Sequence, residues 1–367
     1  MCLTRNALLC LVPPNMLEEV ARRGNDKQRE WALRTLSRDN TIRSARLQNA
    51  KRRGRGPREG ADTLAQGPPG QMSRLVYHCQ NKEKFPIRPE RVEGDDPRGD
   101  DAVDEAYDGF GDTHRFFWEV HHRDSIDDEG MPLRGYVHYG EDYDNAFWDG
   151  RRMVFGDGDG ELFVRFTLSL DVIGHELGHG VTEDEAGLEY YGQSGALNES
   201  QSDVVGSLVK QYKLGQTAEQ ANWLIGDDII GPEVEGEALR SMGAPGTAYD
   251  DDVLGKDPQP AHMDDFVVTT RDNAGVHINS GIPNHAFYTV ATTLGGHAWE
   301  RAGVIWYETL RDPLLRTNAD YQSFADLSCA TAARLYGADG EEVDAVRAGW
   351  DKVGIEVSTA LPTAASR

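Results

Sequence analysis

The sequence predicts an α+β protein, with strands mainly before residue 166 and long helices mainly after residue 168. Between residues 75 and 165, short apolar strand candidates alternate with glycine-rich turns, whereas later segments repeat apolar residues at helical spacing. The chain has 367 residues, of which 38% are hydrophobic and 27% are charged, as in globular proteins of two or three domain-sized units. Strands followed by helices are typical of the α+β class.

The first 60 residues form a basic head on an acidic body. They contain 14 Lys and Arg against 6 Asp and Glu, whereas the other 307 residues contain 24 against 56. Residues 16–36 predict two short helices that break near Gly24 and Asn25. From residue 51 the sequence KRRGRGPREGADTLAQGPPGQ offers almost nothing to bury, which predicts a flexible linker. We therefore expect a short basic head at 1–50 and a protease-accessible linker at 51–74.

The elements of the body follow from hydrophobic periodicity and from turn residues. A run of glycine and aspartate at 156–160 indicates a tight turn. Strands are expected at 135–139, 152–155 and 162–166. Helices are expected at 98–122, 168–183, 197–213, 216–224, 275–294, 298–311, 320–336 and 339–352.

Charge and hydropathy exclude several classes of function. The net charge is −24, which argues against general affinity for nucleic acid or for anionic membranes, so neither is expected as a partner. No apolar run approaches the length of a membrane span, and the stretch from Ala7 to Val12 is too short for a signal peptide.

The four cysteines lack a Cys-x-x-Cys pair and are expected to be reduced. We expect synthesis in the cytoplasm, with release by a leaderless route as an option.

The strongest chemical signal is the sequence His175-Glu176-Leu177-Gly178-His179. On a helix, positions i and i+4 share a face, so both imidazoles can bind one metal while Glu176 lies near its open position. Two imidazoles and an oxygen suit zinc, which lowers the pKa of its bound water to about 7. The same pattern occurs by chance on exposed helices, so a second signal is needed.

That second signal is the sequence GALNESQSD at 195–203. If it begins a helix, Glu199 and Asp203 also lie at i and i+4 on one face. One carboxylate can then bind the metal while the other accepts a hydrogen bond from a ligand imidazole. Two acidic residues on a helix usually lie on a solvent-exposed face. Beside a His-Glu-x-x-His motif, however, a metal site is favoured.

Four motifs in order resemble those of the thermolysin family of zinc metallopeptidases, the M4 family of gluzincin type. They are DNAFWDG at 144–150, HELGHGVTE at 175–183, GALNESQSD at 195–203 and DNAGVHINSGIPN at 272–284, and GWDKVGIEV closes the similarity at 349–357. The short head with its Val-Pro-Pro-Asn sequence resembles the protealysin-like branch. The resemblance implies a strand-rich catalytic lobe at 75–186 that includes the zinc helix, a helical catalytic lobe at 187–357 and a tail at 358–367.

The resemblance also implies the function. The chain would be a zinc-dependent metalloendopeptidase, made as an autoprocessed zymogen, that cuts peptides and proteins on the N-terminal side of bulky hydrophobic residues. One catalytic zinc would be bound by His175, His179 and Glu199, and Asp203 would orient His175. Glu176 would be the general base that activates the zinc-bound water and passes its proton to the leaving amine.

Further roles come from the same resemblance. His277 and Tyr190 would donate hydrogen bonds to the oxyanion, and Asp272 would hold His277 in its donating form. Asn145 and Ala146 would bind the substrate backbone. Arg240 would hold the carbonyl of the residue after the scissile bond. The pocket for that residue would be apolar, with the large Phe166 disfavouring the largest aromatic side chains. Its positions are Phe163, Phe166, Val172, Ile229 and Leu239.

One departure from the family concerns calcium. Asp171 and Asp227 match ligands of the family's double calcium site, but Lys210 stands where a bridging glutamate is expected. An ammonium group can neutralise a residual acid without a metal. We therefore predict that the double calcium site is absent and that Lys210 pairs with Asp171. Calcium elsewhere, for instance at the 157–159 turn, remains open.

The head would act as an intramolecular inhibitor. Residues 13–16 are expected to pack near the active site until cleavage within about residues 40–74 releases a mature form that starts near Arg74. Two rival hypotheses are a Cys10 thiolate that binds the zinc, and a permanent domain at 1–50. A dedicated protein inhibitor is a further partner that the sequence leaves open.

Two other functions remain as alternatives. One is a catalytically idle peptide-binding protein, which is disfavoured because every position needed for turnover carries the required residue. The other is a zinc hydrolase that acts on substrates other than peptides. Asn145 and Arg240, as binders of a peptide backbone, argue against it, and an assay on a blocked dipeptide would discriminate.

Overall fold

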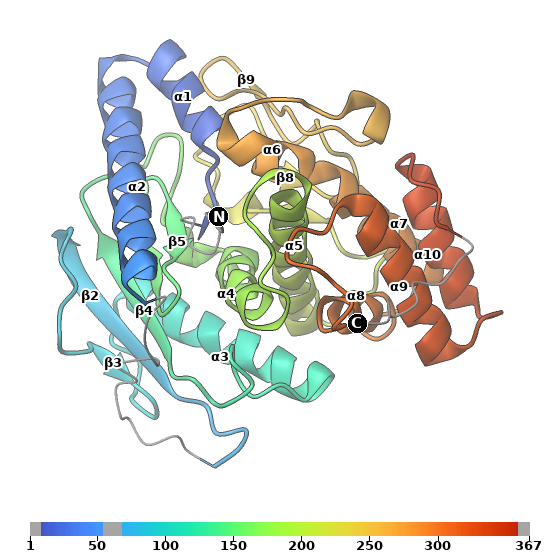
Figure 1. Cartoon of the computed structure of the whole chain (residues 1–367). Coiled ribbons are helices and arrows are strands. Elements are labelled where there is room, and N and C mark those ends of the chain that lie inside the picture. Colours follow the sequence, from blue (N-terminus) through green and yellow to red (C-terminus); the bar gives the residue numbers. More distant parts are fainter. Residues whose placement is uncertain (1–8, 54–67, 359–367) are drawn as a thin grey trace.

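The computed structural model describes the backbone of residues 9–53 and 68–358, together with the side chains of residues 10–41 and 68–358. Within these ranges a strand-rich part and a helical part lie on either side of two central helices, α4 and α5 (Figure 1). Helix α4 covers Leu170–Glu185 and helix α5 covers Gly192–Leu214. The predicted α+β class and two-lobed arrangement are confirmed.

A six-stranded mixed sheet forms the strand-rich part. Its order is β1-β5-β6-β4-β2-β3; strand β4 is parallel to β2 and to β6, and the other neighbours are antiparallel. The sequence predicted β4 and β6 but did not single out the long strand β2. The strands cover Leu9–Cys10 (β1), Arg74–Lys82 (β2), Arg91–Val92 (β3), Leu133–Tyr139 (β4), Ala146–Trp148 (β5) and Met153–Phe155 (β6).

Helix α3, Asp101–His121, packs on strands β2 and β4 and matches the helix expected at 98–122. Asp100 caps its N-terminus by accepting a hydrogen bond from the Val103 amide at 3.1 Å. The helix lies close to the sheet, since a Cβ on Gly135 of β4 would be 2.7 Å from the ring of Phe110.

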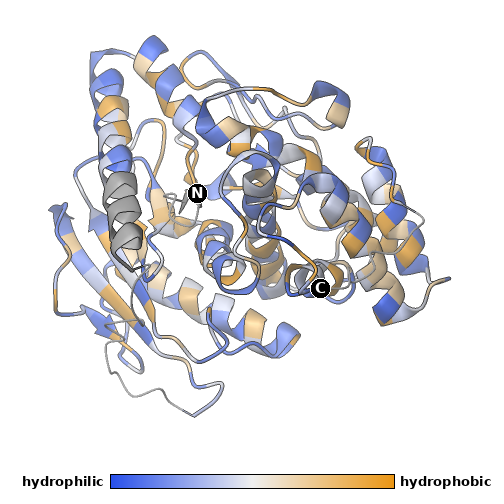
Figure 2. Cartoon of the chain, in the orientation of Figure 1, coloured by the Kyte–Doolittle hydropathy of each residue, from blue (hydrophilic) through white to orange (hydrophobic). Residues whose placement is uncertain are grey.

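The helical part follows α5, and its helices pack their apolar sides inward (Figure 2). Two small two-stranded sheets, β7 with β8 and β9 with β10, precede these helices. The strands cover Leu224–Ile225, Arg240–Ser241, Asp250–Asp251 and Gly255–Lys256. The helices cover Asp272–Asn279 (α6), Gly281–Leu294 (α7), Ala302–Leu310 (α8), Tyr321–Tyr336 (α9) and Glu341–Lys352 (α10).

The head forms two helices, α1 (Pro14–Arg23) and α2 (Asp26–Arg53), with the break at Gly24 and Asn25 that the sequence predicts. Helix α2 is longer than expected and takes in residues 51–53, the start of the expected linker. Lysine and arginine are good helix formers, so a charged run by itself does not end a helix.

Two predicted elements are wrong. Residues 162–166 form no strand, because the Asp159 carboxylate accepts hydrogen bonds from three consecutive amides, at 161–163, and turns the chain. Residues 216–224 form no helix. Gly215 ends α5 in a left-handed conformation, and Trp223 has a φ of 56° just before strand β7.

Candidate active site

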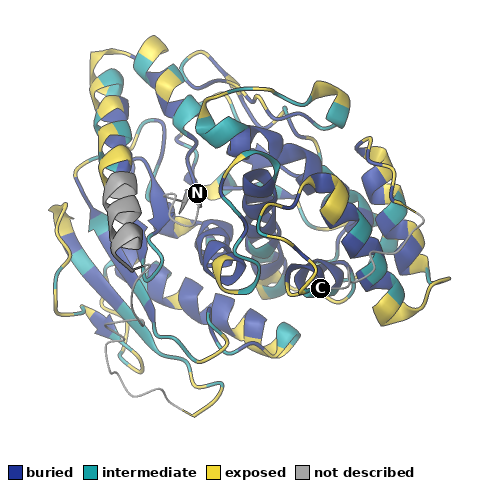
Figure 3. Cartoon of the chain, viewed as in Figure 1, coloured by how far each residue is buried: buried dark blue, intermediate teal, exposed yellow. Residues whose placement is uncertain are grey.

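Helices α4 and α5 lie close enough to bring their side chains into one buried cluster. A Cβ on Gly178 of α4 would lie 3.1 Å from the Cα of Ser202 on α5, and one on Gly206 would lie 2.3 Å from the Asp171 carbonyl oxygen. Larger residues at these positions would push the helices apart. Both helices are dark blue, and so buried, where they meet (Figure 3). The poor helix propensity of Gly178 is therefore offset by close packing.

His175 and His179 of α4 face Glu199 of α5. All three side chains are fully buried. Glu199 Oε2 lies 3.6 Å from His175 Nε2, and Oε1 lies 3.5 Å from His179 Nε2. With zinc–ligand bonds of roughly 2.1 Å, the ligands of a tetrahedral site lie about 3.4 Å apart. The three donor atoms therefore have the spacing of a zinc site.

The outer nitrogen of each imidazole fixes the tautomer. His175 Nδ1 is 2.8 Å from an oxygen of Asp203, and His179 Nδ1 is 2.8 Å from the side-chain oxygen of Asn198. These oxygens only accept, so each Nδ1 carries the hydrogen and each Nε2 keeps its lone pair. Both Nε2 atoms and Oε2 of Glu199 are buried without a hydrogen-bond partner. Three converging acceptors without a donor are costly, and they fit a bound cation.

Electrostatics keep the ligands in the right charge state. Burial lowers the pKa of His179 well below its ordinary value, so its imidazole is neutral, as a ligand must be. Burial opposes ionisation of Asp203, but Arg240 and His175 outweigh it and hold the pKa of Asp203 well below its ordinary value. Arg240 donates to both Asp203 oxygens at 2.8 and 2.9 Å, and Asn284 donates at 2.8 Å. Asp203 is therefore a fixed negative charge behind His175.

Tyr190 and His277 lie beside Glu199. The Tyr190 hydroxyl donates to Glu199 and lies 3.1 Å from His277 Nε2. His277 Nδ1 is 2.6 Å from an oxygen of Asp272. Burial opposes protonation of His277, but Asp272 and Glu199 outweigh it and raise the pKa of His277 to about 9. In the metal-free protein, both ring nitrogens of His277 can therefore donate at neutral pH.

The backbone around Asp272 is strained. Asp272, Asn273 and Ala274 have φ values of 50°, 48° and 66° ahead of Gly275 at 79°. Left-handed residues other than glycine cost roughly 1–2 kcal/mol each. In this conformation the Asp272 carboxylate accepts from the His277 amide at 2.8 Å as well as from its ring. The strain thus accompanies a fixed imidazole, as is common at functional sites.

The head reaches this site through an extended segment. Strand β1 pairs with β5, and the Leu11 amide donates to the Ala146 carbonyl at 3.1 Å. The Cys10 carbonyl is 2.9 Å from His277 Nε2. Arg240 donates to the Leu11 carbonyl at 3.1 Å. Side chains expected to bind a substrate backbone thus bind the backbone of the head.

Asn145 is held by the head from two directions. Its Oδ1 accepts from the Val12 amide at 2.9 Å, and its Nδ2 donates to Asp39 of α2 at 3.0 Å. Residues 10–12 make these hydrogen bonds, directly before the segment 13–16 that the sequence predicts to pack near the site. Proline has no amide hydrogen for a strand, so the Pro13-Pro14 pair starts α1 instead.

Cys10 is not placed as a zinc ligand. Among the described residues, the candidate ligands that lie within 4.8 Å of one another here are only His175, His179 and Glu199. The Cys10 side chain is buried in a cluster with aromatic residues of the sheet. Cys79 and Cys329 are free thiols, Cys10 forms no disulfide with another described cysteine, and Cys2 lies outside the described residues.

The apolar positions expected to form the pocket after the scissile bond are all buried, in the same hydrophobic cluster as Leu11. The rings of Phe163 and Phe166 pack with their centroids 6.0 Å apart. The positions are Phe163, Phe166, Val172, Ile229 and Leu239.

Lys210 of α5 stands among the acids that match calcium ligands. Its ammonium group is 2.9 Å from the buried Asp171 carboxylate, also contacts Asp227, and lies 3.5 Å from Asp228. Burial disfavours the charged amine, but Asp171 and Asp227 outweigh it and raise the pKa of Lys210. The predicted pair of Lys210 with Asp171 is therefore present.

Comparison with known proteins identifies the family. Residues 76–183 match the thermolysin metallopeptidase catalytic domain, and residues 186–355 match its alpha-helical domain. The chain belongs to the thermolysin metallopeptidase family. An extracellular metalloprotease of Pectobacterium carotovorum subsp. carotovorum is 50% identical to it over 95% of this chain and 96% of that protein. Protease PrtS of a Photorhabdus species (strain Az29) is 46% identical over 95% and 92%.

A solved structure extends the similarity to the head. The precursor of protealysin, a metalloproteinase from Serratia proteamaculans, aligns with a TM-score of 0.85 and 48% identity over 95% of this chain and 99% of that chain. The chain is therefore a protealysin-like zinc metalloendopeptidase of the thermolysin family. No helix among its described residues has the length and apolarity to cross a membrane.

Several partners of the site were not foreseen from the sequence. Asn198 and Ser202 both lie 2.8 Å from His179 Nδ1, and Asn284 donates to Asp203. Asn198 and Ser202 lie at i and i+4 on α5 and could have been found by that spacing. Asp39 could not, because its contact with Asn145 joins elements 106 residues apart.

Proposed function

We propose that this metalloendopeptidase is made as a zymogen, that its head blocks the active site as a substrate would, and that it removes the head itself. The observation that carries the proposal is the binding of residues 10–12. The Cys10 carbonyl accepts from His277, the Leu11 carbonyl accepts from Arg240, and the Val12 amide donates to Asn145. This is the pattern expected of a peptide with Cys10 before and Leu11 after the scissile bond.

The chemistry follows from the roles of the side chains. His175, His179 and Glu199 would hold the zinc, which supplies a Lewis acid for the carbonyl and a water of lowered pKa. Glu176, buried on α4 beside His175, would take the proton from the attacking water and pass it to the departing amine nitrogen.

Two further donors would stabilise the transition state. His277 and Tyr190 would donate to the oxygen on which charge develops, and Asp272 would fix the His277 ring. Arg240 would orient the next carbonyl while remaining paired with Asp203. Such fixed donors favour the transition state because they need no reorganisation during the reaction.

The position of Leu11 supports a preference for bulky hydrophobic residues after the scissile bond. Leu11 is fully buried, and its carbonyl is bound by Arg240, as expected for the residue after the scissile bond. A blocked dipeptide with leucine at this position should be cut faster than one with alanine or aspartate. Equal rates for the three would contradict the preference.

We expect self-cleavage within about residues 40–74, at or beyond the C-terminal end of α2. The test is intact mass over time for the full-length chain, a zinc-chelated sample and the variant Glu176→Ala. Glu183→Ala is a matched control, because Glu183 is exposed on the same helix. Only the untreated wild type and Glu183→Ala should lose the head.

The same measurement separates other outcomes. Loss of only ten residues would mean cleavage between Cys10 and Leu11, and would contradict a maturation site at 40–74. If all samples keep their full mass, self-processing is wrong and the head is a permanent domain or is removed by another protease.

The proposal also covers calcium binding. Lys210 already neutralises Asp171 and Asp227, so the family's double calcium site should be absent. At the 157–159 turn, both aspartates are engaged by protein donors, which also disfavours calcium.

The name of the relative from Pectobacterium supports export of this enzyme. Detection of the mature form in culture medium of unlysed producing cells would test this.

A further inference from the structure

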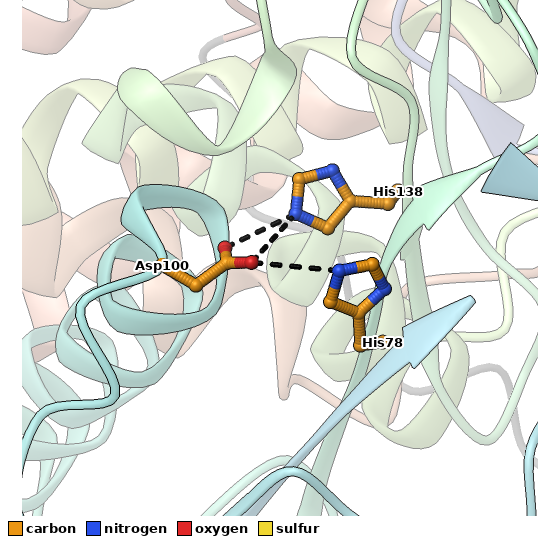
Figure 4. A group of neighbouring side chains, drawn as sticks. All are labelled: His78, Asp100 and His138. Carbon is orange, nitrogen blue, oxygen red and sulfur yellow. Dashed lines mark hydrogen bonds and ion pairs between the residues drawn. The ribbon is translucent and has the colours of Figure 1, made fainter. Parts of the chain in front are cut away.

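A second group of metal-binding side chains lies on the sheet, away from α4 and α5. His78 is on β2, His138 is on the neighbouring strand β4, and Asp100 precedes α3. Figure 4 shows a nitrogen of each imidazole directed at the Asp100 carboxylate. The two rings lie with centroids 4.3 Å apart. Among the described residues, this group and the His175 group are the ones whose donor atoms lie within 4.8 Å of one another.

The backbone departs from regular strand geometry to form this group. In the parallel pair of β2 and β4, His78 is in register with Val137, so alternation would place His138 on the opposite face of the sheet. His138 instead has a φ of 52°, and the register shifts beyond His78. This left-handed residue carries its imidazole to the side of α3, where His78 and Asp100 lie. Such backbone strain is concentrated at functional sites.

The donor spacing fits zinc. His138 Nε2 is 3.1 Å from one oxygen of Asp100, and His78 Nε2 is 3.5 Å from the other. Ligands of a tetrahedral zinc lie about 3.4 Å apart when the bonds are roughly 2.1 Å. The corresponding distances in the His175 group are 3.5 and 3.6 Å. The imidazole-to-carboxylate distances of the two groups are therefore similar, although His138 Nε2 is hydrogen-bonded to Asp100, whereas the Nε2 atoms of His175 and His179 have no hydrogen-bond partner among the described residues.

His138 also has the outer partner that metal-binding imidazoles usually have. Its Nδ1 is 2.8 Å from the Asp157 carboxylate and its Nε2 is 3.1 Å from the Asp100 carboxylate, so both nitrogens donate in the metal-free protein. Binding zinc through Nε2 requires that hydrogen to leave, while Nδ1 keeps its bond to Asp157. His175 and Asp203 show the same arrangement in the catalytic cluster. Asn81 donates to the same Asp157 oxygen at 3.0 Å and holds that carboxylate in place.

Because of His78, we expect this group to bind zinc more weakly than the His175 group does. Its Nδ1 accepts from the Gln80 amide at 2.9 Å, which places the ring hydrogen on Nε2 in the metal-free protein. Binding through Nε2 requires that hydrogen to leave and the Gln80 amide to find another acceptor. The group is partly open to solvent, with 20–30% of each side chain exposed, so water can supply the acceptor and the fourth ligand.

We propose that His78, Asp100 and His138 form a second zinc site, distinct from the catalytic centre, which ties β2 and β4 to the N-terminus of α3. Two imidazoles and one carboxylate are a ligand set that zinc favours. No substrate-binding residue belongs to this group, so the ion would stabilise the sheet and would not take part in peptide hydrolysis.

The test counts zinc in the full-length chain with Glu176→Gln, which keeps the head attached. The metal-free protein is titrated with Zn²⁺ alone, and bound zinc is measured by mass spectrometry of the metal after gel filtration. We expect two zinc ions per chain, with the second bound more weakly. The added double substitution His78→Asn and His138→Asn should reduce this to one. The added substitution His179→Ala should also leave one.

Matched controls make each result decisive. His262→Ala removes a surface histidine that pairs with Asp264 in the same way, and should keep two zinc ions. Thermal melting followed by circular dichroism checks that each variant folds, and His78→Asn alone replaces the double variant if that one does not. Binding of a single zinc by the Glu176→Gln chain, or of two by a folded His78→Asn variant, would overturn the proposal.

Discussion

Two clusters of side chains lie at the contact of α4 and α5. The zinc cluster consists of His175, His179 and Glu199, and the Lys210 cluster consists of Lys210, Asp171 and Asp227. Each must compensate the charge of a buried carboxylate, and they do so in opposite ways. At the first, Glu199 is fully buried, and its Oε2 and two imidazole nitrogens have no hydrogen-bond partner. At the second, Asp171 is just as buried, four residues before His175 on α4, but the ammonium group of Lys210 contacts it at 2.9 Å. A zinc ion from solution would satisfy the three acceptors of the first cluster, whereas the second cluster carries its own cation.

This difference shows two ways in which one helix pair can neutralise a buried carboxylate. A buried carboxylate must be paired, and either a metal or a side chain can supply the charge. Lys210 supplies it beside Asp171 and Asp227. Among the described residues no lysine or arginine forms an ion pair with Glu199; His277 Nε2 lies 3.5 Å from its Oε1, and Arg240 is paired with Asp203.

The largest expected effect comes from removing the general base at the zinc cluster while keeping its three expected zinc ligands. Glu176→Gln should lower kcat/KM on a blocked dipeptide by about 10²–10⁴-fold, because general base catalysis contributes this much. Zinc content should stay at the wild-type value, since Glu176 is not a ligand. Steady-state kinetics and metal analysis of the same preparation check this. Loss of zinc in this variant would mean that Glu176 takes part in binding the metal.

The second prediction concerns the cluster that carries its own cation. Lys210→Met should lower the free energy of unfolding by roughly 3–5 kcal/mol, because it leaves the buried Asp171 carboxylate without its lysine counter-charge. Urea unfolding in the Glu176→Gln background measures the change. Lys213→Met on the same helix is the control, and should cost about 1 kcal/mol or less because Lys213 is half-exposed and Asp112 keeps Arg115 as a partner. Equal losses in the two variants would contradict the comparison.

The third prediction converts one kind of cluster into the other. Lys210→Glu should be destabilised in the absence of metal and should be stabilised again by calcium, by about 2.7 kcal/mol at 100 times the dissociation constant. The wild type should show no such response, because its ammonium group excludes the ion. Melting temperatures with and without millimolar calcium provide the measurement. A calcium response in the wild type that survives in Lys210→Met would place calcium elsewhere.

The smallest effect is a difference in pH dependence. The pKa of Lys210 is higher in the folded than in the unfolded chain, since Asp171 and Asp227 outweigh burial. Its contribution is therefore complete below the unfolded value of about 10.5 and is lost only as pH rises through the folded value. The stability difference between Lys210 and Lys210→Met should stay constant from pH 7 to 10, by urea unfolding with chelator. A difference that shrinks within this range would show that the ammonium group deprotonates early.

Much of the catalytic centre could be predicted because its signal is local. The pairs His175 with His179, and Glu199 with Asp203, follow from the four-residue spacing that a helix converts into one face. The pair of Lys210 with Asp171 follows from the family's calcium pattern. Residues 162–166 and 216–224 were mispredicted because apolar residues there suit a strand or a helix, while capping carboxylates and left-handed residues decide the backbone.

The sequence by itself therefore determined the α+β class, the two ligand-bearing helices, the family and the acid that would serve as general base. Tertiary structure alone decided that the glycine contact of α4 and α5 leaves three buried acceptors without donors, and that residues 10–12 lie in the site. It also decided that His138 turns to the same side of the sheet as His78. The physical reason is range: helical spacing is fixed by neighbouring residues, whereas donors, charges and strand faces are fixed by segments far apart in the chain.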